Sequence, residues 1–230
     1  MLRGRISDLH DNGVDVYADS VVNHTGTTEP DGGHYPPFPD RSYFHDPYDS
    51  GRTTKQLYGL WDLKHENGEV TNTLRDFCYT LGNDLGFDGF RWDAAKHVPK
   101  WWFRDYANQW ADDLGMFAVG EVYDGNTDFV MDYVDTGMNC FDYPLHYTMK
   151  SEFAYGGNLS NVADAVRNGN SIMGRDAYHA STFVDNHDDD PPGNRKLAHA
   201  FVLGAPGYPM IFANHAKSEG VDIDADWLTN

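Results

Sequence analysis

The chain has 230 residues, 40% of them hydrophobic, which is enough for one large domain or two small ones with a sizeable core. Its 17 basic and 36 acidic residues give a net charge of -19, so nucleic acid and anionic membrane surfaces are disfavoured as partners because both would repel it. The acidic residues are spread along the whole chain, a composition typical of proteins that work in high salt. The sequence has no apolar run of about 18 residues, so no membrane-spanning helix is expected.

Taken in chain order, the sequence predicts strands that alternate with helices. A helix at 2–10 precedes a strand at 14–22, and then regular periodicity disappears until about residue 67. Gly, Pro, Asp, His and Tyr dominate this stretch, which predicts a small irregular subdomain. The later expected elements are helices at 69–81, 99–114, 159–167 and 196–203, and strands at 87–92, 116–119, 139–143, 180–184 and 208–212.

Polar and acidic side chains lie where four of these strands end. Asp19 with Asn23, Asp93, Glu121 and Asp188 are separated by one or more strand–helix steps of roughly 30 residues, the spacing of parallel βαβ units. A parallel α/β barrel brings all of its strand ends to one rim, whereas a doubly wound sheet does so only near its switch point. The distribution therefore favours an α/β fold of the TIM-barrel type.

The stretch around Asp93 carries the most specific chemistry. Arg91 and Asp93 are two residues apart on a strand, so their side chains point to the same face. A guanidinium beside a carboxylate fixes its orientation, as a carboxylate nucleophile requires. These residues alone leave a structural salt bridge at the strand end as an equal alternative.

Three carboxylates on one rim can share a reaction. Two carboxyl groups about 5 Å apart serve retaining glycoside hydrolysis, one as nucleophile and the other as proton donor. Burial and negative neighbours would help Glu121 hold the proton, and a third carboxylate can stabilise positive charge on the sugar ring. A transition-metal site at 185–188 is disfavoured because no His-x-x-x-His or Cys partner accompanies it. Asp189 and Asp190 are expected to form a solvated acidic turn.

Five motifs in register carry a family resemblance. They are Asp19-Ser-Val-Val-Asn-His24, Leu60-Trp-Asp-Leu63, Gly89-Phe-Arg-Trp-Asp-Ala-Ala-Lys-His97, Val119-Gly-Glu121 and Phe183-Val-Asp-Asn-His-Asp188. With them the chain resembles the α-amylase family, glycoside hydrolase family 13. The resemblance implies a (β/α)8 TIM-type barrel that is present in part, as strands 3 to 8, so the chain is expected to be truncated at both ends. Residues 1–23 and 68–230 would form the barrel, and 24–67 an irregular subdomain inserted after strand 3.

The resemblance also implies roles for individual residues. By position, Asp93 matches the nucleophile, Glu121 the acid/base, Asp188 the transition-state stabiliser and Arg91 the arginine that positions the nucleophile. The remaining matches bind ligands: His24 and His187 the sugar, Lys96 and His97 the acceptor side, and Asn23, Asp62 and the main-chain carbonyl of His97 a calcium ion. Such oxygen ligands suit Ca²⁺.

The implied function is retaining endo-hydrolysis of α-1,4-glucosidic bonds. The expected substrate is an α-glucan polysaccharide of the starch or glycogen type, or a maltooligosaccharide. Two alternatives stay open: an α-glucan transglycosylase of the same family, which shares the covalent intermediate, and a catalytically inactive truncated barrel.

Overall fold

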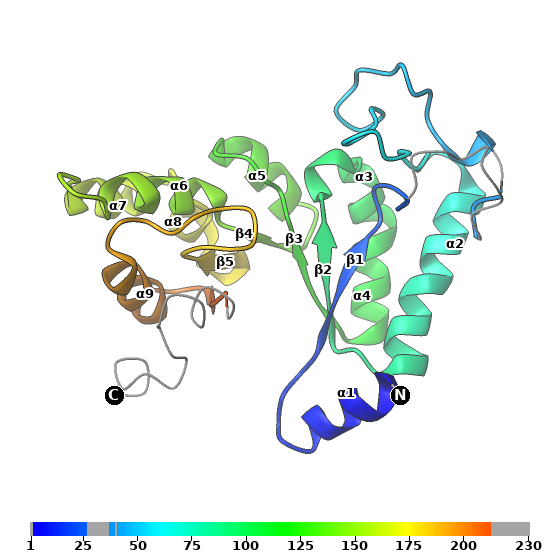
Figure 1. The fold of residues 1–230 in the computed structure, drawn as a ribbon, viewed down its shortest axis with the longest axis horizontal. Coiled ribbons are helices and arrows are strands. Elements are labelled where there is room, and N and C mark those ends of the chain that lie inside the picture. Colours follow the sequence, from blue (N-terminus) through cyan, green and yellow to red (C-terminus); the bar gives the residue numbers. More distant parts are fainter. Residues whose placement is uncertain (1, 27–36, 40, 213–230) are drawn as a thin grey trace. The chain divides into compact units, whose positions relative to one another are not determined.

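The computed structural model describes residues 2–26, 37–39 and 41–212 (Figure 1). The chain divides into two compact units, Met1–Tyr123 with Asp132–Met138, and Asp124–Met131 with Asn139–Asn230. Within each unit the paired strands are parallel and are separated along the chain by helices. The predicted alternation of parallel strands and helices is therefore confirmed. Among the described residues, every helix is too short or too polar to cross a membrane. The proposed division into barrel and inserted subdomain stays a prediction, and residues 27–36 and 40 of that insertion lie outside the described part.

The first unit is built on three neighbouring strands, β1 (Tyr17–Val21), β2 (Gly89–Asp93) and β3 (Phe117–Gly120). Their register places Gly89 between Tyr17 and Phe117, whose rings stack at 5.3 Å across it. A Cβ atom at Gly89 would lie 2.7 Å from the Phe117 carbonyl oxygen and from the Tyr17 ring. The glycine thus permits the close ring stack that holds the three strands in register.

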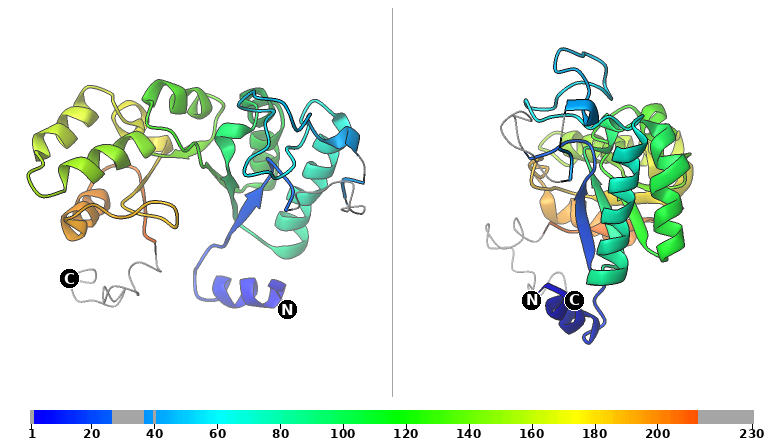
Figure 2. Two further views of the ribbon diagram at one scale, coloured as in Figure 1. Left: turned by 45° about the horizontal axis from the view of Figure 1, so that its top comes forward. Right: turned by 90° about the vertical axis from the view of Figure 1, so that its right-hand side faces the viewer.

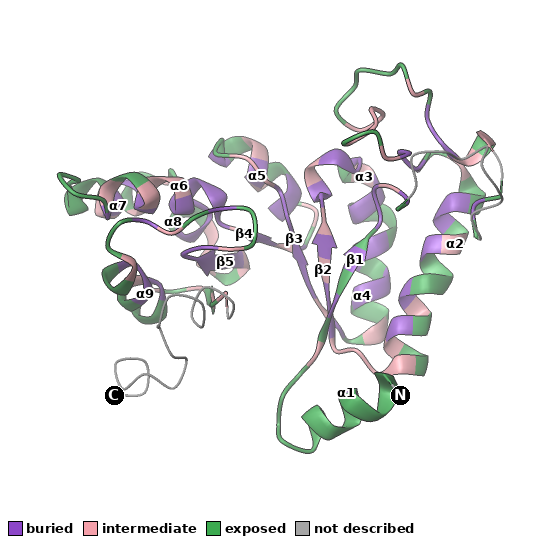
Figure 3. Ribbon diagram, viewed as in Figure 1, coloured by how far each residue is buried: buried purple, intermediate pink, exposed green. Residues whose placement is uncertain are grey.

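Helices α2 (Gly68–Tyr79) and α4 (Asn108–Leu114) pack against each other beside these strands (Figures 1 and 2). The predicted helix at 99–114 is continuous but contains a π-helical segment, Phe103–Ala107, between α3 (Lys100–Trp102) and α4. Helix α1 (Leu2–His10) is exposed along most of its length, with Ile6 as its buried residue (Figure 3).

Helix α2 begins at a side-chain cap and buries only part of its predicted apolar face. The Asn67 side chain caps the helix by accepting a hydrogen bond from the Glu69 N–H at 2.9 Å. Leu74 and Cys78 are buried as the periodicity predicts, but Phe77 is 40% exposed. The helix supplies more apolar surface than the described part of the unit covers.

The second unit contains β4 (Asn139–Phe141), β5 (Ala180–Phe183) and β6 (Tyr208–Met210). Its helices are α6 (Tyr143–Glu152), α7 (Leu159–Arg167), α8 (Ile172–Asp176) and α9 (Arg195–Gly204), and α5 (Thr127–Val134) crosses the boundary between the units. The sequence did not predict α5, α6 or α8. The strand expected at 139–143 ends at Phe141, because Asp142 caps α6 and Pro144 follows in its first turn.

A buried histidine in the first unit makes acid stability testable. His65 donates from Nε2 to the Val22 carbonyl at 3.0 Å, and burial lowers the pKa of His65 to about 4. In the unfolded chain that pKa is about 6.5, so between these values the unfolded state binds a proton that the folded state does not. The free energy of unfolding should therefore fall as the pH is lowered through this window, by up to about 3 kcal/mol for this group.

Urea denaturation at pH 7 and pH 4.5 would measure the effect. The matched variant is His65→Gln, whose amide can still donate to the Val22 carbonyl but cannot titrate. The variant should lose clearly less stability than the wild type between the two pH values. Equal losses would show that His65 does not contribute to acid sensitivity.

Candidate active site

Side chains from β1, from β2 and from the residue after β3 meet at Arg91. Arg91 Nη1 donates to Asp19 Oδ1 at 2.8 Å and also to Asp93 Oδ1, and Nη2 donates to Glu121 Oε1. Asp19 lies opposite Arg91 in the β1–β2 register, and Glu121 directly follows β3. Burial opposes protonation of Arg91, but the neighbouring carboxylates of Glu121, Asp19 and Asp93 raise its pKa. One guanidinium thus holds three acids together in this unit.

Glu121 is held through both of its oxygens. The residue is buried, and Oε2 accepts a hydrogen bond from the Ala94 N–H at 3.0 Å while Oε1 contacts Arg91. Ala94 has a left-handed backbone with φ of 49°, a conformation that costs a non-glycine residue on the order of 1 kcal/mol. This backbone conformation points the Ala94 N–H toward Glu121. The sequence had pointed to negative neighbours for Glu121 and did not predict this ion pair.

The predicted substrate residues of the first unit lie close to the same strand ends. Burial lowers the pKa of His24, although Asp93 opposes the change, and burial likewise lowers the pKa of His97. Both imidazoles are therefore neutral near pH 7, and His97 Nδ1 donates to the Arg52 carbonyl at 3.0 Å. Lys96 donates to the main-chain carbonyl of Tyr123, and its ammonium lies 5.5 Å from the centre of the Tyr123 ring.

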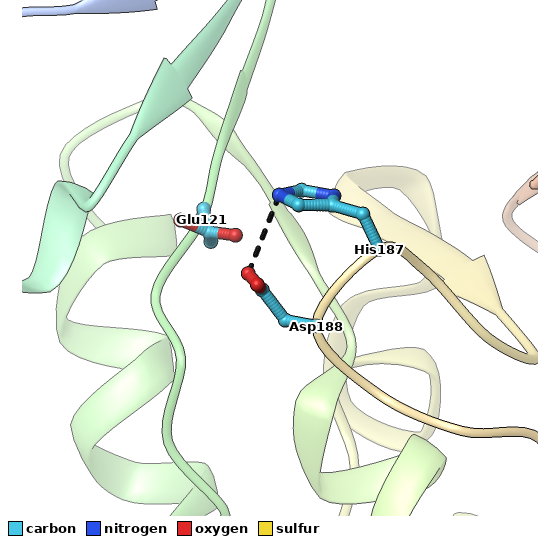
Figure 4. Close-up of side chains that lie close together, drawn as sticks. All are labelled: Glu121, His187 and Asp188. Atoms are coloured by element: carbon cyan, nitrogen blue, oxygen red, sulfur yellow. Dashed lines mark ion pairs between the residues drawn. The ribbon is translucent and has the colours of Figure 1, made fainter.

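His187 and Asp188 belong to the second unit and follow β5. His187 Nε2 lies 3.3 Å from Asp188 Oδ2, and both side chains are about half exposed, at 56% and 51%. Figure 4 draws this ion pair as a dashed line and also shows Glu121, which comes from the segment after β3. The two predicted site residues of this unit are therefore neighbours with accessible polar atoms.

The three oxygens predicted to bind calcium lie together. Asn23 and Asp62 are buried at 0% and 1% exposure. With Asn23 Nδ2 placed 3.2 Å from His24 Nδ1, the Asn23 side-chain oxygen faces Asp62 Oδ1 at 3.2 Å and the His97 carbonyl oxygen at 2.9 Å. The hydrogen bonds are satisfied when the amide is turned the other way, so that its nitrogen donates to both oxygens. With its oxygen turned toward them, the same three groups would offer a cation three oxygen ligands. Since Ca²⁺ binds oxygens at 2.3–2.6 Å, oxygens about 3 Å apart fit its coordination shell.

The second carboxylate oxygen of Asp62 contacts His45, a residue that the sequence did not single out. His45 Nδ1 lies 2.6 Å from Asp62 Oδ2, and His45 Nε2 lies 2.9 Å from Glu66 Oε2. Burial raises the pKa of Asp62 to about 6, against the opposing effect of His45. His45 comes from the aperiodic stretch, so no local pattern could have paired it with Asp62.

The expectation for Asp189 is wrong. Asp189 is buried at 8% exposure, and its Oδ1 accepts a hydrogen bond from Lys150 Nζ at 2.8 Å. The cause is α6, which the sequence analysis missed and which brings the lysine to the segment after β5. Asp190, in contrast, is exposed as expected.

Comparisons with known proteins relate the chain to α-amylases and to a cyclomaltodextrin glucanotransferase. No family model matches the chain. It is 32% identical to the beta/alpha-amylase of Paenibacillus polymyxa over 92% of this chain and 19% of that protein. It is 31% identical to the cyclomaltodextrin glucanotransferase of Bacillus licheniformis over 69% of this chain and 23% of that protein. Among solved structures, the α-amylase of Geobacillus thermoleovorans in complex with acarbose matches with a TM-score of 0.78 at 25% identity, covering 92% of this chain and 52% of that one. The chain thus spans about half, or less, of these proteins, and the predicted partial barrel fold is confirmed.

Proposed function

Since this chain is related to the α-amylases, we propose that the protein hydrolyses internal α-1,4-glucosidic bonds of starch- or glycogen-type glucans with retention of configuration. The observation that carries the proposal is the contact of one guanidinium, that of Arg91, with both Asp93 and Glu121. A retaining mechanism needs two neighbouring carboxyl groups with different roles, and this contact supplies a fixed pair at the ends of β2 and β3.

In this proposal Asp93 is the nucleophile and Glu121 the acid/base. An Asp93 oxygen attacks the anomeric carbon while the Glu121 carboxyl group gives its proton to the departing glycosidic oxygen, so that a glycosyl–Asp93 ester forms and the leaving sugar is released. Water then attacks the same carbon, Glu121 takes its proton, and Asp93 leaves as a carboxylate. Arg91 orients Asp93, and Asp188 would stabilise the positive charge that develops on the sugar ring.

The neighbouring polar residues would bind the glucan. His24 and His97 are neutral donors and acceptors at neutral pH, which suits contacts with sugar hydroxyls. His187 would contact the glucan from the second unit. Lys96, held at the Tyr123 carbonyl, would contribute to the acceptor side. The experiment that tests the function is incubation of the protein with soluble starch, with detection of new reducing ends and of α-configured products. A product of β-configuration would contradict the mechanism.

We also propose that Asn23 Oδ1, Asp62 Oδ1 and the His97 carbonyl oxygen hold a calcium ion. Bound there, Ca²⁺ would supply electrostatic cross-linking and not chemistry, because its ligands come from the segment after β1, the aperiodic stretch and the turn after β2. His45 orients Asp62 for this purpose. The support is the convergence of the buried Asn23 side-chain amide, Asp62 Oδ1 and the His97 carbonyl oxygen, groups whose oxygens suit Ca²⁺.

Removal of calcium should lower the melting temperature. Binding to the folded state alone stabilises it by about 2.7 kcal/mol when the free ion is at 100 times its dissociation constant. Thermal unfolding with excess chelator, and with Ca²⁺ restored in steps, measures this shift. Asp62→Asn should be less stable and should no longer respond to the chelator. A wild-type melting temperature that is indifferent to chelator would count against the site.

A transglycosylase is the second candidate, favoured by the similarity to a cyclomaltodextrin glucanotransferase. Both activities proceed through the same glycosyl–enzyme and differ in whether water or a sugar hydroxyl attacks it. Incubation with maltohexaose separates them: hydrolysis yields shorter oligosaccharides, and transfer also yields longer or cyclic ones. A folded protein that yields neither would support the inactive alternative.

A further inference from the structure

In the segment that follows β5, two exposed residues lie between buried ones. His187 and Asp188 are exposed, whereas Asp185 and Asp189, which flank them, are 3% and 8% exposed. Asp185 Oδ2 lies 3.5 Å from Arg195 Nε at the start of α9, and Asp189 Oδ1 accepts from Lys150 Nζ on α6. The turn is therefore attached to a different helix at each end.

Hydrogen bonds inside the turn define its backbone. The side-chain oxygen of Asn186 accepts from the N–H groups of Asp188 at 2.9 Å and Asp189 at 2.7 Å, and the Asn186 N–H donates to the Asp189 carbonyl at 3.3 Å. The Asn186 amide in turn donates to the Tyr143 hydroxyl at 3.1 Å. Such a turn fixes the direction in which Asp188 leaves the backbone.

Helix α6 supplies the partners of Asp189 from one face. His146 and Lys150 are four residues apart, so their side chains lie one above the other. His146 is fully buried, stacks on Phe183 at 4.6 Å, and lies 3.7 Å from Asp189 Oδ2. Burial lowers the pKa of His146, so this imidazole is neutral at neutral pH. On this face of α6, the ammonium of Lys150 therefore supplies the positive charge that contacts Asp189. Loss of Lys150 would leave the buried Asp189 carboxylate without its cation, whereas Lys150 itself is partly exposed to solvent.

We propose that Asp189 is a positioning residue: through its ion pair with Lys150 it fixes the turn 186–189 and thereby the direction of the Asp188 carboxylate. The role assigned to Asp188 rests on the proposed function. The adjacent Asp190 is exposed and is the matched control, because it belongs to the same acidic run but not to the buried contact.

Kinetics on a maltooligosaccharide, with the whole protein that carries this sequence, test the inference. Asp189→Asn and Lys150→Met should each lower kcat by about 10- to 100-fold, since small displacements of a reacting group cost this much, while KM should change less than about twofold. Asp190→Asn should leave both constants unchanged. In an Asp188→Asn background, Asp189→Asn should cause little further loss, because the group that it positions is already altered. Equal losses in both backgrounds, or no loss in either, would overturn the proposal.

Hydrogen exchange gives a readout that does not depend on activity. The amides of Asp188 and Asp189 should exchange about tenfold faster in Asp189→Asn and Lys150→Met than in the wild type or Asp190→Asn, because the turn opens more often. Unchanged exchange in these variants, with folding verified by circular dichroism, would refute the inference whatever the activity. If the wild type proved inactive on glucans while exchange responded, the proposed function would fail and the contribution of Asp189 to the turn would stand.

Discussion

Replacement of Asp93 by asparagine is expected to abolish turnover of every α-glucan, with a loss in kcat of about 10⁴-fold or more, because an amide cannot form the glycosyl ester. The change is nearly isosteric and leaves an oxygen that can still accept from Arg91, so folding should be preserved. Activity on soluble starch and on an α-glucosyl fluoride measures the loss. The matched control is Asp112→Asn, at an exposed position on α4, which should have wild-type activity.

The roles of Asp93 and Glu121 can then be separated by the leaving group. Glu121→Gln cannot donate a proton, which a sugar leaving group needs and a fluoride does not. This variant should therefore fail on starch but still release fluoride as the enzyme is glycosylated, whereas Asp93→Asn should fail on both. Substantial activity in Asp93→Asn, or an equal loss on both substrates in Glu121→Gln, would show that the roles are assigned wrongly.

Replacement of Asp142 by alanine should destabilise the second unit severely. The Asp142 carboxylate is 1% exposed and accepts from the N–H of Leu145 at 3.1 Å, of Ile172 at 3.0 Å and of Met173 at 2.8 Å. The Asp142 carboxylate thus caps α6 and also accepts hydrogen bonds from the first two N–H groups of α8. Burial raises the pKa of Asp142, while these three N–H groups oppose that rise by stabilising its charge. The variant leaves three buried donors without their acceptor, at about 1–3 kcal/mol each.

The expected loss in the free energy of unfolding is therefore about 4 kcal/mol, measured by urea denaturation. Ser171→Ala is the matched control, because the Ser171 hydroxyl caps the same helix α8 through a single bond, from the Gly174 N–H at 3.0 Å. That variant should lose only about 1 kcal/mol. Similar losses in the two variants would show that Asp142 acts as an ordinary helix cap and does not join two helices.

Local patterns in the sequence were sufficient for the strand–helix order, for the placement of Arg91 within a strand, and for the placement of Asp93 and Glu121 at strand ends. Alternation with period two and apolar repeats near 3.6 residues are properties of a short stretch, and a parallel arrangement follows from the helix that separates each pair of strands. The same locality explains the error at 139–143. There Cys140, Phe141 and Tyr143 are typical strand residues, but Asp142 between them already caps a helix.

Only the tertiary structure decided which side chains meet. Arg91 reaches Asp19 from the neighbouring strand and Glu121 from the one beyond, His45 meets Asp62, and Lys150 neutralises Asp189. Each pair joins residues far apart in the chain, so no periodicity or spacing marks it. A carboxylate such as Asp189, within a run of acids, has the sequence signature of a solvated turn, and it is buried here because a cation from another helix offsets the cost of removing its charge from water.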